Sequence, residues 1–135
     1  MTRPALLLPL LLICLTAVAA IPQEDPPVLK LDPPALVVDA DSAGFVVTRV
    51  RFVNTGGGTA TVSSVTGSCG CASASVQRNH ASGITYGELR LGINAQSFKD
   101  SLNNVDFTVH SNARNSPSVI RVVVRKHIAA KDTTQ

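Results

Sequence analysis

Through most of the chain, apolar and polar residues alternate in steps of two, and no stretch keeps a helical period. The clearest example is FVVTRVRFV, residues 45–53. There Val50 and Phe52 share one face of the predicted strand, whereas two arginines occupy the other. Turn-forming residues separate this segment from further alternating segments. These are residues 28–31, 35–39, 59–66, 72–77, 84–93, 105–110 and 118–129.

The segments between the predicted strands are turns and connections. Residues 54–58, NTGGG, contain residue types that tolerate positive φ, and they predict a hairpin turn. Residues 78–83 and 94–104 predict polar connections. About seven short strands without a helix, in 135 residues, predict an all-β fold, an immunoglobulin-like antiparallel β-sandwich. Its predicted core includes Val50, Phe52, Val62, Leu91, Phe107 and Val122.

The start of the chain has the features of an export signal. Arg3 supplies a positive charge, residues 5–14 form an apolar run, and residues 17–20 offer small side chains for cleavage. The apolar run is shorter than the roughly 20 residues of a membrane-spanning helix. We therefore expect cleavage and no membrane span afterwards. Cys14 does not follow a small residue, as a lipid-attachment site requires, so we expect no lipid there.

These features divide the chain into four parts. We predict a signal peptide at residues 1–20, a proline-rich and solvated lead-in at residues 21–27, one domain at residues 28–128 and a flexible tail at residues 129–135. An export signal implies a secreted protein in an oxidising compartment. We therefore expect a periplasmic or extracellular location.

Composition narrows the classes of function. The net charge is only +3, the basic residues are scattered along the sequence, Trp is absent and Tyr86 is the single tyrosine. Nucleic-acid binding needs clustered basic residues and aromatic rings on which bases stack, so we expect no nucleic-acid partner. The sequence also lacks a nucleophile elbow, a His-Glu-x-x-His motif, a phosphate-binding loop and a Cys-x-x-Cys pair. We therefore expect no enzymatic activity.

The segment GSCGCAS, residues 67–73, holds the two cysteines that follow the predicted leader, Cys69 and Cys71. In an extended strand, residues two apart lie about 6.6 Å from each other on one face. A disulfide requires Cβ atoms only about 3.5–4.5 Å apart. The two cysteines can therefore bond only if the chain bends, and Gly70 between them permits a bend.

Three interpretations of the cysteine pair stay open. The two residues are small side chains packed where the chain crosses between sheets, at the end of the strand that begins near residue 60. Alternatively, they form a local disulfide or redox pair. In the third interpretation, two thiolates share a soft metal ion such as Cu(I), with His80 as the candidate for a further ligand.

A longer segment, RFVNTGGGTATVSSVTGSCGCAS (residues 51–73), contains a strand, an Asn-Thr-Gly turn, a second strand and a Ser-Cys-Gly-Cys motif. It resembles a family of exported bacterial Ig-like domains, domain of unknown function 1573. Residues 105–124 are similar to the closing hairpin of that family. The resemblance extends from Leu31 to Ile128, with Tyr-Gly-Glu at residues 86–88 where the family has Pro-Gly-Glu. It implies the fold and the exported location and supplies no reaction.

Two functions are compatible with these patterns. The first is a binding or structural module of the cell envelope that presents a strand edge or a loop to another envelope or extracellular protein. The apolar segment VIRVVV, residues 119–124, would serve if it lay at a sheet edge. The alternative is a small thiol- or metal-handling protein that uses Cys69 and Cys71 to bind a soft metal such as copper. We expect no other cofactor.

Overall fold

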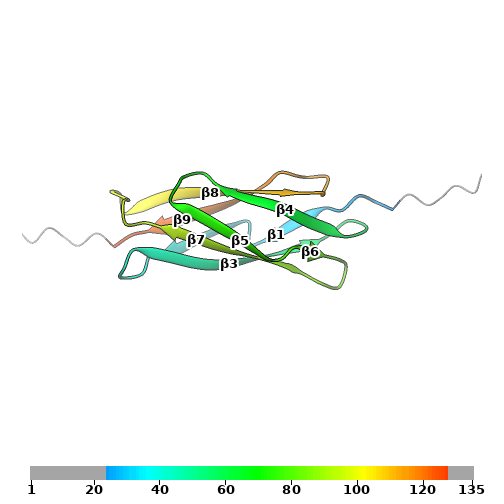
Figure 1. The fold of residues 1–135 in the computed structure, drawn as a ribbon, viewed down its shortest axis with the longest axis horizontal. Coiled ribbons are helices and arrows are strands. Elements are labelled where there is room, and N and C mark those ends of the chain that lie inside the picture. The colour runs from blue at the N-terminus through cyan, green and yellow to red at the C-terminus, as the bar shows by residue number, and fades with distance from the viewer. Residues whose placement is uncertain (1–23, 128–135) are drawn as a thin grey trace, which may run out of the picture.

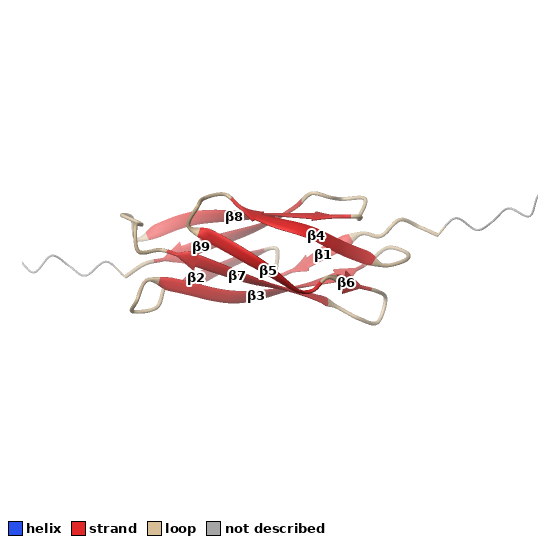
Figure 2. Ribbon diagram, viewed as in Figure 1, coloured by secondary structure: helices blue, strands red, loops and turns tan. Residues whose placement is uncertain are grey.

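The computed structural model describes residues 24–127, which form strands and loops without a helix (Figure 2). No helix in this described part is long and apolar enough to cross a membrane. The strands are β1 (Leu29–Asp32), β2 (Ala35–Asp39), β3 (Phe45–Asn54), β4 (Ala60–Gly67), β5 (Ala72–Arg78), β6 (His80–Ala81), β7 (Gly87–Asn94), β8 (Leu102–Ser111) and β9 (Ser118–Arg125). The predicted leader and tail lie outside the described residues.

Two sheets enclose the core (Figure 1). One has the order β1-β3-β7-β5 and the other the order β2-β9-β8-β4-β6. The predicted β-sandwich is therefore confirmed, with nine strands where about seven were predicted. The two-residue β6 pairs with β4 inside residues 78–83, which had been predicted as a connection.

All pairs are antiparallel except β2 with β9, which is parallel. Only Pro33 and Pro34 separate β1 from β2, so the chain keeps its direction while it moves from one sheet to the other. Arg121 N donates to Pro34 O at 3.0 Å, which begins the pairing with β9. An otherwise antiparallel sandwich thus acquires one parallel edge.

The core is formed by the inward residues of both sheets, as the alternation predicted. All six predicted core side chains are buried, and Val50, Phe52 and Phe107 have no exposed surface. The other large side chains that are fully buried include Leu89, Leu91, Ile93, Val105, Val109, Ile120, Val122 and Val124. The arginine face of β3 points outward, so the predicted orientation of that strand is confirmed.

The segment VIRVVV lies in β9, between β2 and β8. Its backbone is therefore paired on both sides, so the condition under which it could serve as a binding edge is not met. The reason is that β2 adds to the sheet after the Pro33–Pro34 step. In the four-stranded sheet, the strands paired on one side only are β1 and β5.

The NTGGG segment is not the predicted hairpin, because β3 and β4 belong to different sheets. Its conformation depends on Asn54, the one polar residue among residues 24–127 that is buried. The Asn54 Oδ1 atom accepts hydrogen bonds from the N–H groups of Val28 (3.1 Å) and Gly56 (2.9 Å). The Nδ2 group donates to the carbonyl oxygens of Gly57 (3.1 Å) and Gly58 (2.9 Å).

The described end of the lead-in packs on this segment. A Cβ atom at Gly56 or Gly57 would overlap the carbonyl oxygen of Pro26 or Asp25, so these glycines allow two backbones to approach closely. Among the three glycines of the NTGGG segment, only Gly58 has a positive φ, of 63°. The backbone of residues 25–28 therefore contacts the domain, while residues 24–26 of the predicted solvated lead-in are exposed.

We expect Phe107→Ala to lower the free energy of unfolding by about 3–5 kcal/mol, because it removes a fully buried ring and leaves a cavity. The matched control is Phe45→Ala, whose ring is 41% exposed and should cost much less. Urea unfolding followed by circular dichroism measures both. Equal losses would contradict this assignment of the core.

Candidate functional site

The SCGC motif lies where the chain leaves β4 at Gly67 and enters β5 at Ala72. It therefore crosses from the five-stranded sheet to the four-stranded sheet, as predicted. Ala72 N donates to Cys69 O at 3.2 Å and closes a tight turn. Both cysteines are half-buried and contact the hydrophobic core.

In the structure, Cys69 and Cys71 are joined by a disulfide, and their Cα atoms lie 5.1 Å apart. This separation is shorter than the about 6.6 Å of an extended strand, so the chain bends between the two residues. Packing and bonding, which had been separate interpretations, occur together here. In this form the sulfur atoms are bonded to each other, and neither is a thiolate that could bind a metal ion.

Hydrogen bonds tie the turn to both sheets. Ser68 N donates to Asp106 O at 2.8 Å, and Asp106 N donates to Ser68 Oγ at 3.0 Å. On the other side, Asn94 N donates to Cys71 O at 2.8 Å. The serine of the motif thus extends the β4–β8 pairing, and the second cysteine begins the β5–β7 pairing. The turn is held rigidly between the layers.

The two glycines of the motif have different roles. A Cβ atom at Gly67 would overlap the Cβ of Ala72, because the end of β4 passes close to the start of β5. A Cβ atom at Gly70 would have no neighbour within 4 Å. Positive φ angles among the described glycines occur only at Gly44 and Gly58. The chain bends between the cysteines as expected, but Gly70 makes this bend without a positive φ and with open space at its Cβ position, so the bend does not require glycine there. The close approach at Gly67 is what requires glycine.

His80 lies far from the cysteines. It is in β6, opposite Thr61, and its Nδ1 lies 3.0 Å from Thr61 Oγ1. Thr61 is at the start of β4 and the cysteines follow its end, about 20 Å away at about 3.3 Å per residue. Within residues 24–127, no three His, Cys, Asp or Glu side chains gather in a way that could hold a metal ion. The structure brings Cys69 and Cys71 together but places His80 away from them, and soft-metal binding stays a prediction for the reduced protein.

A groove that the sequence reasoning missed begins beside the disulfide. Two adjoining hollows of about 380 and 320 Å³ share Val47, Ser73 and Gly92 on the outer face of the four-stranded sheet. Phe45 and Cys71 line the first hollow. We call this surface the Gly92 groove, and it comprises Phe45, Val47, Cys71, Ser73 and Gly92.

Apolar side chains remain exposed at this groove. Phe45 is 41% exposed and Val47 is 62% exposed, and both belong to the outward face of β3. The sequence contained the signal, because the alternation that placed the arginines of β3 outward also places Phe45 and Val47 outward. The charge of the two arginines on that face did not indicate the apolar side chains beside them.

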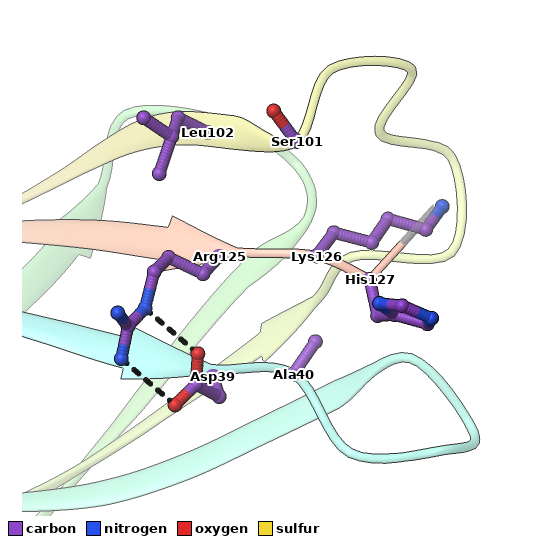
Figure 3. Close-up of a pocket in the computed structure, with 7 residues that line it drawn as sticks. All are labelled: Asp39, Ala40, Ser101, Leu102, Arg125, Lys126 and His127. Carbon is purple, nitrogen blue, oxygen red and sulfur yellow. Dashed lines mark hydrogen bonds and ion pairs between the residues drawn. The ribbon is translucent and has the colours of Figure 1, made fainter. Parts of the chain in front are cut away.

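Apart from the Gly92 groove, a hollow of about 590 Å³ lies at the end of β9 and reaches His127, the last described residue (Figure 3). Its charged side chains are already partnered. Arg125 and Asp39 form an ion pair at 2.8 Å, and Lys126 Nζ donates to the carbonyl oxygens of Gln96 and Phe98 at 2.8 Å each. These contacts connect β2, β9 and the β7–β8 loop, so they serve the fold.

The chain matches the model of a family described as Protein of unknown function (DUF1573), over residues 38–125. It belongs to this family. The match includes both the NTGGG segment and the SCGC motif, so the predicted resemblance is confirmed. In this DUF1573 chain, the two motifs carry the backbone between the sheets at opposite ends of β4.

Solved structures share the fold of this DUF1573 chain. A protein of unknown function from Porphyromonas gingivalis W83 has 18% sequence identity and a TM-score of 0.65, and the match covers 81% of this chain and 51% of that one. The Vibrio cholerae VesB protease has 13% identity and a TM-score of 0.55, with 74% and 32% covered. The secreted serine protease VesC from Vibrio cholerae has 12% identity and a TM-score of 0.51, with 70% and 22% covered.

The chain thus spans about half the length of the Porphyromonas protein and smaller shares of the two proteases. At these identities the likeness concerns the fold alone. A comparison with curated proteins gives no match.

We expect Gly67→Ala to lower the free energy of unfolding by about 1–3 kcal/mol, because the added methyl group overlaps Ala72 and forces the turn to shift. The matched control in the same motif is Gly70→Ala, which should leave stability unchanged or slightly higher. Denaturant titrations of both variants measure the difference. Equal destabilisation would show that the motif needs its glycines for another reason.

We expect the purified mature protein to contain no free thiol before reduction, as measured with a thiol-reactive dye in denaturant. Reduction, or the double substitution Cys69→Ser and Cys71→Ser, should change the free energy of unfolding by less than about 2 kcal/mol, because so short a loop restrains the unfolded chain little. Two free thiols, or one bound soft metal ion per chain in elemental analysis, would contradict this expectation.

Proposed function

We propose that this chain is a binding module that presents the outer face of its four-stranded sheet, centred on the Gly92 groove, to another protein of the bacterial envelope or the extracellular space. One observation carries the proposal. Phe45 and Val47 are exposed around a hollow with a glycine floor, on a sheet face that is otherwise polar and charged. Apolar side chains around a hollow, with polar residues beside them, are typical of interaction sites.

The construction of the groove supports this proposal. A Cβ atom at Gly92 would lie 2.7 Å from Ser73 Oγ, so the glycine keeps the floor open. One wall is the Cys69–Cys71 turn, which is held to both sheets by the hydrogen bonds described above. A rigid groove loses little conformational entropy when a ligand binds, which favours affinity.

The neighbouring edge supports it as well. Within the described residues β5 pairs only with β7, so its other side offers backbone hydrogen-bonding groups after Ala72, whose N–H donates to Cys69 O. Extended segments of partner proteins bind such edges as an added strand. The first residues of β5 are alanine and serine, whose small side chains leave the backbone accessible.

The exported location follows from the predicted leader and gives the class of partner. A module of the periplasm or the cell exterior meets other envelope proteins. The family description carries no activity, and the likeness to the two Vibrio proteases is one of fold. The proposal is therefore a module without enzymatic activity of its own.

Photo-crosslinking in the source bacterium tests the proposal. The photoreactive residue benzoylphenylalanine replaces Val47 in one variant and Val37 in the control, which is similarly exposed (58%) on the other sheet. We expect a specific protein adduct from position 47 only. The adduct is identified by mass spectrometry, and the purified partner should bind the wild-type domain about tenfold or more tightly than Val47→Asp. No adduct at 47, or the same adducts at both positions, would overturn the proposal.

A further inference from the structure

We infer that the segment recognised by this face is an acidic, extended polypeptide, and that Arg49, Arg51, Arg78 and Arg90 bind its carboxylates. The inference rests on the proposed function and names the chemistry of the partner. It follows from the register of the strands, the balance of charge on the two outer faces and the position of the groove.

Strand register gathers residues that are scattered in the sequence. Arg51 on β3, Glu88 on β7 and Arg78 on β5 lie opposite one another in one row. In the next row, Arg49 lies directly opposite Arg90. Neighbouring strands are about 4.8 Å apart, so four guanidinium groups are carried by two adjacent rows of three strands. The net charge of the whole chain gave no indication of this cluster.

The cluster has more positive charge than its own carboxylate can balance. Glu88 pairs with Arg49 at 3.4 Å, and within residues 24–127 Arg51, Arg78 and Arg90 form no ion pair. The arginines of β9 on the other sheet differ, because each has an acidic partner. Arg121 pairs with Asp106 at 3.3 Å, and Arg125 pairs with Asp39 at 2.8 Å.

The facing pair Arg49 and Arg90 is unfavourable for the sheet, because like charges directly opposite each other on neighbouring strands repel. A carboxylate bound between them would remove this repulsion. Arginine suits that role, since its planar guanidinium group donates two parallel hydrogen bonds to a carboxylate.

Tyr86 orders two of the four side chains. The guanidinium carbon of Arg51 lies 4.6 Å from the centre of the Tyr86 ring, and that of Arg78 lies 5.2 Å from it. Cation–π attraction of this kind restrains long side chains that solvent would otherwise leave free. The arginines at one end of the cluster are thus placed before any ligand binds.

The groove selects a polypeptide among possible anions. The row that follows Arg49 and Arg90 is Val47, Gly92 and Ser73, the centre of the Gly92 groove. Successive rows are two residues apart, about 6.6 Å, which is also the spacing of same-face side chains in an extended peptide. An extended segment with acidic, any, acidic, any, apolar residues that lies on the outer face along β7 would place its carboxylates over the arginine rows and its apolar side chain in the groove.

Fluorescence anisotropy with a synthetic peptide tests this inference on the purified mature chain. The probe is a fluorescein-labelled peptide that contains Glu-Ser-Glu-Ser-Leu, and the comparison peptides replace both Glu by Gln or the Leu by Ser. We expect the acidic peptide to bind, and each replacement to weaken binding about tenfold or more. Raising NaCl from about 50 mM to about 500 mM should also weaken binding.

The variants are Arg78→Ala with Arg90→Ala, and the matched controls are Arg114→Ala, an exposed arginine of the β8–β9 loop, and a thermal melt of each protein. We expect the double variant to lose about tenfold or more in affinity and Arg114→Ala to lose less than about twofold. Equal binding of the Gln peptide, or equal effects of the two sets of variants, would overturn the inference. Tighter binding of a thymidine oligonucleotide would also overturn it, in favour of a general polyanion site.

The two proposals fail separately. If position 47 forms a specific adduct but the arginine variants bind that partner normally, the acidic chemistry is wrong and the binding module stands. If position 47 forms no adduct, the binding module fails whatever the synthetic peptide does.

Discussion

The sandwich depends on the chain crossing between its two sheets without leaving buried backbone groups unpaired. The chain changes sheet at several places, and two of these crossings lie at the two ends of β4. Unpaired backbone N–H and C=O groups in a core are costly. At one crossing, the side chain of Asn54 supplies the missing partners. At the other, Ser68 and the carbonyl group of Cys71 continue the ladders of two different sheets.

The two crossings at the ends of β4 explain why the NTGGG and SCGC segments of this chain contain such different residues. The Asn54 side chain carries two N–H donors and an oxygen acceptor, so it can pair with both the N–H and the C=O groups of the loop. Gly67 is required because two strands approach too closely for a side chain. The disulfide is one part of the second crossing and joins residues that are already neighbours, so its contribution lies in the shape of the turn. That turn then forms a wall of the Gly92 groove.

The fold could be predicted from the sequence to the extent that burial alternates with period two. The inward residues of β3, β7, β8 and β9 were predicted correctly because one face of each strand is fully buried. Which strands neighbour each other could not be predicted in this way, because alternation carries no information about pairing. The hairpin predicted at NTGGG was wrong for that reason, and alternation could not tell whether VIRVVV lies at a sheet edge.

The candidate site was predicted less well, for a related reason. The position of the cysteines at a sheet crossing followed from a strand end next to glycine and serine. The distance of His80 depends on β6 pairing with the start of β4, which involves only two residues and has no sequence signal. The arginine cluster depends on the registers of three strands, which place Arg49 directly opposite Arg90, 41 positions later in the sequence.

The parallel pairing of β2 with β9 has a mechanical consequence. The two ends of the described chain lie at opposite ends of the long axis (Figure 1). β2, the second strand of the chain, and β9, its last described strand, run side by side in the same direction. Tension between the ends would therefore pull these two strands past each other along their length. All the hydrogen bonds between them would bear that load together and would have to break at once, so the domain is built to transmit force along its axis rather than to unzip.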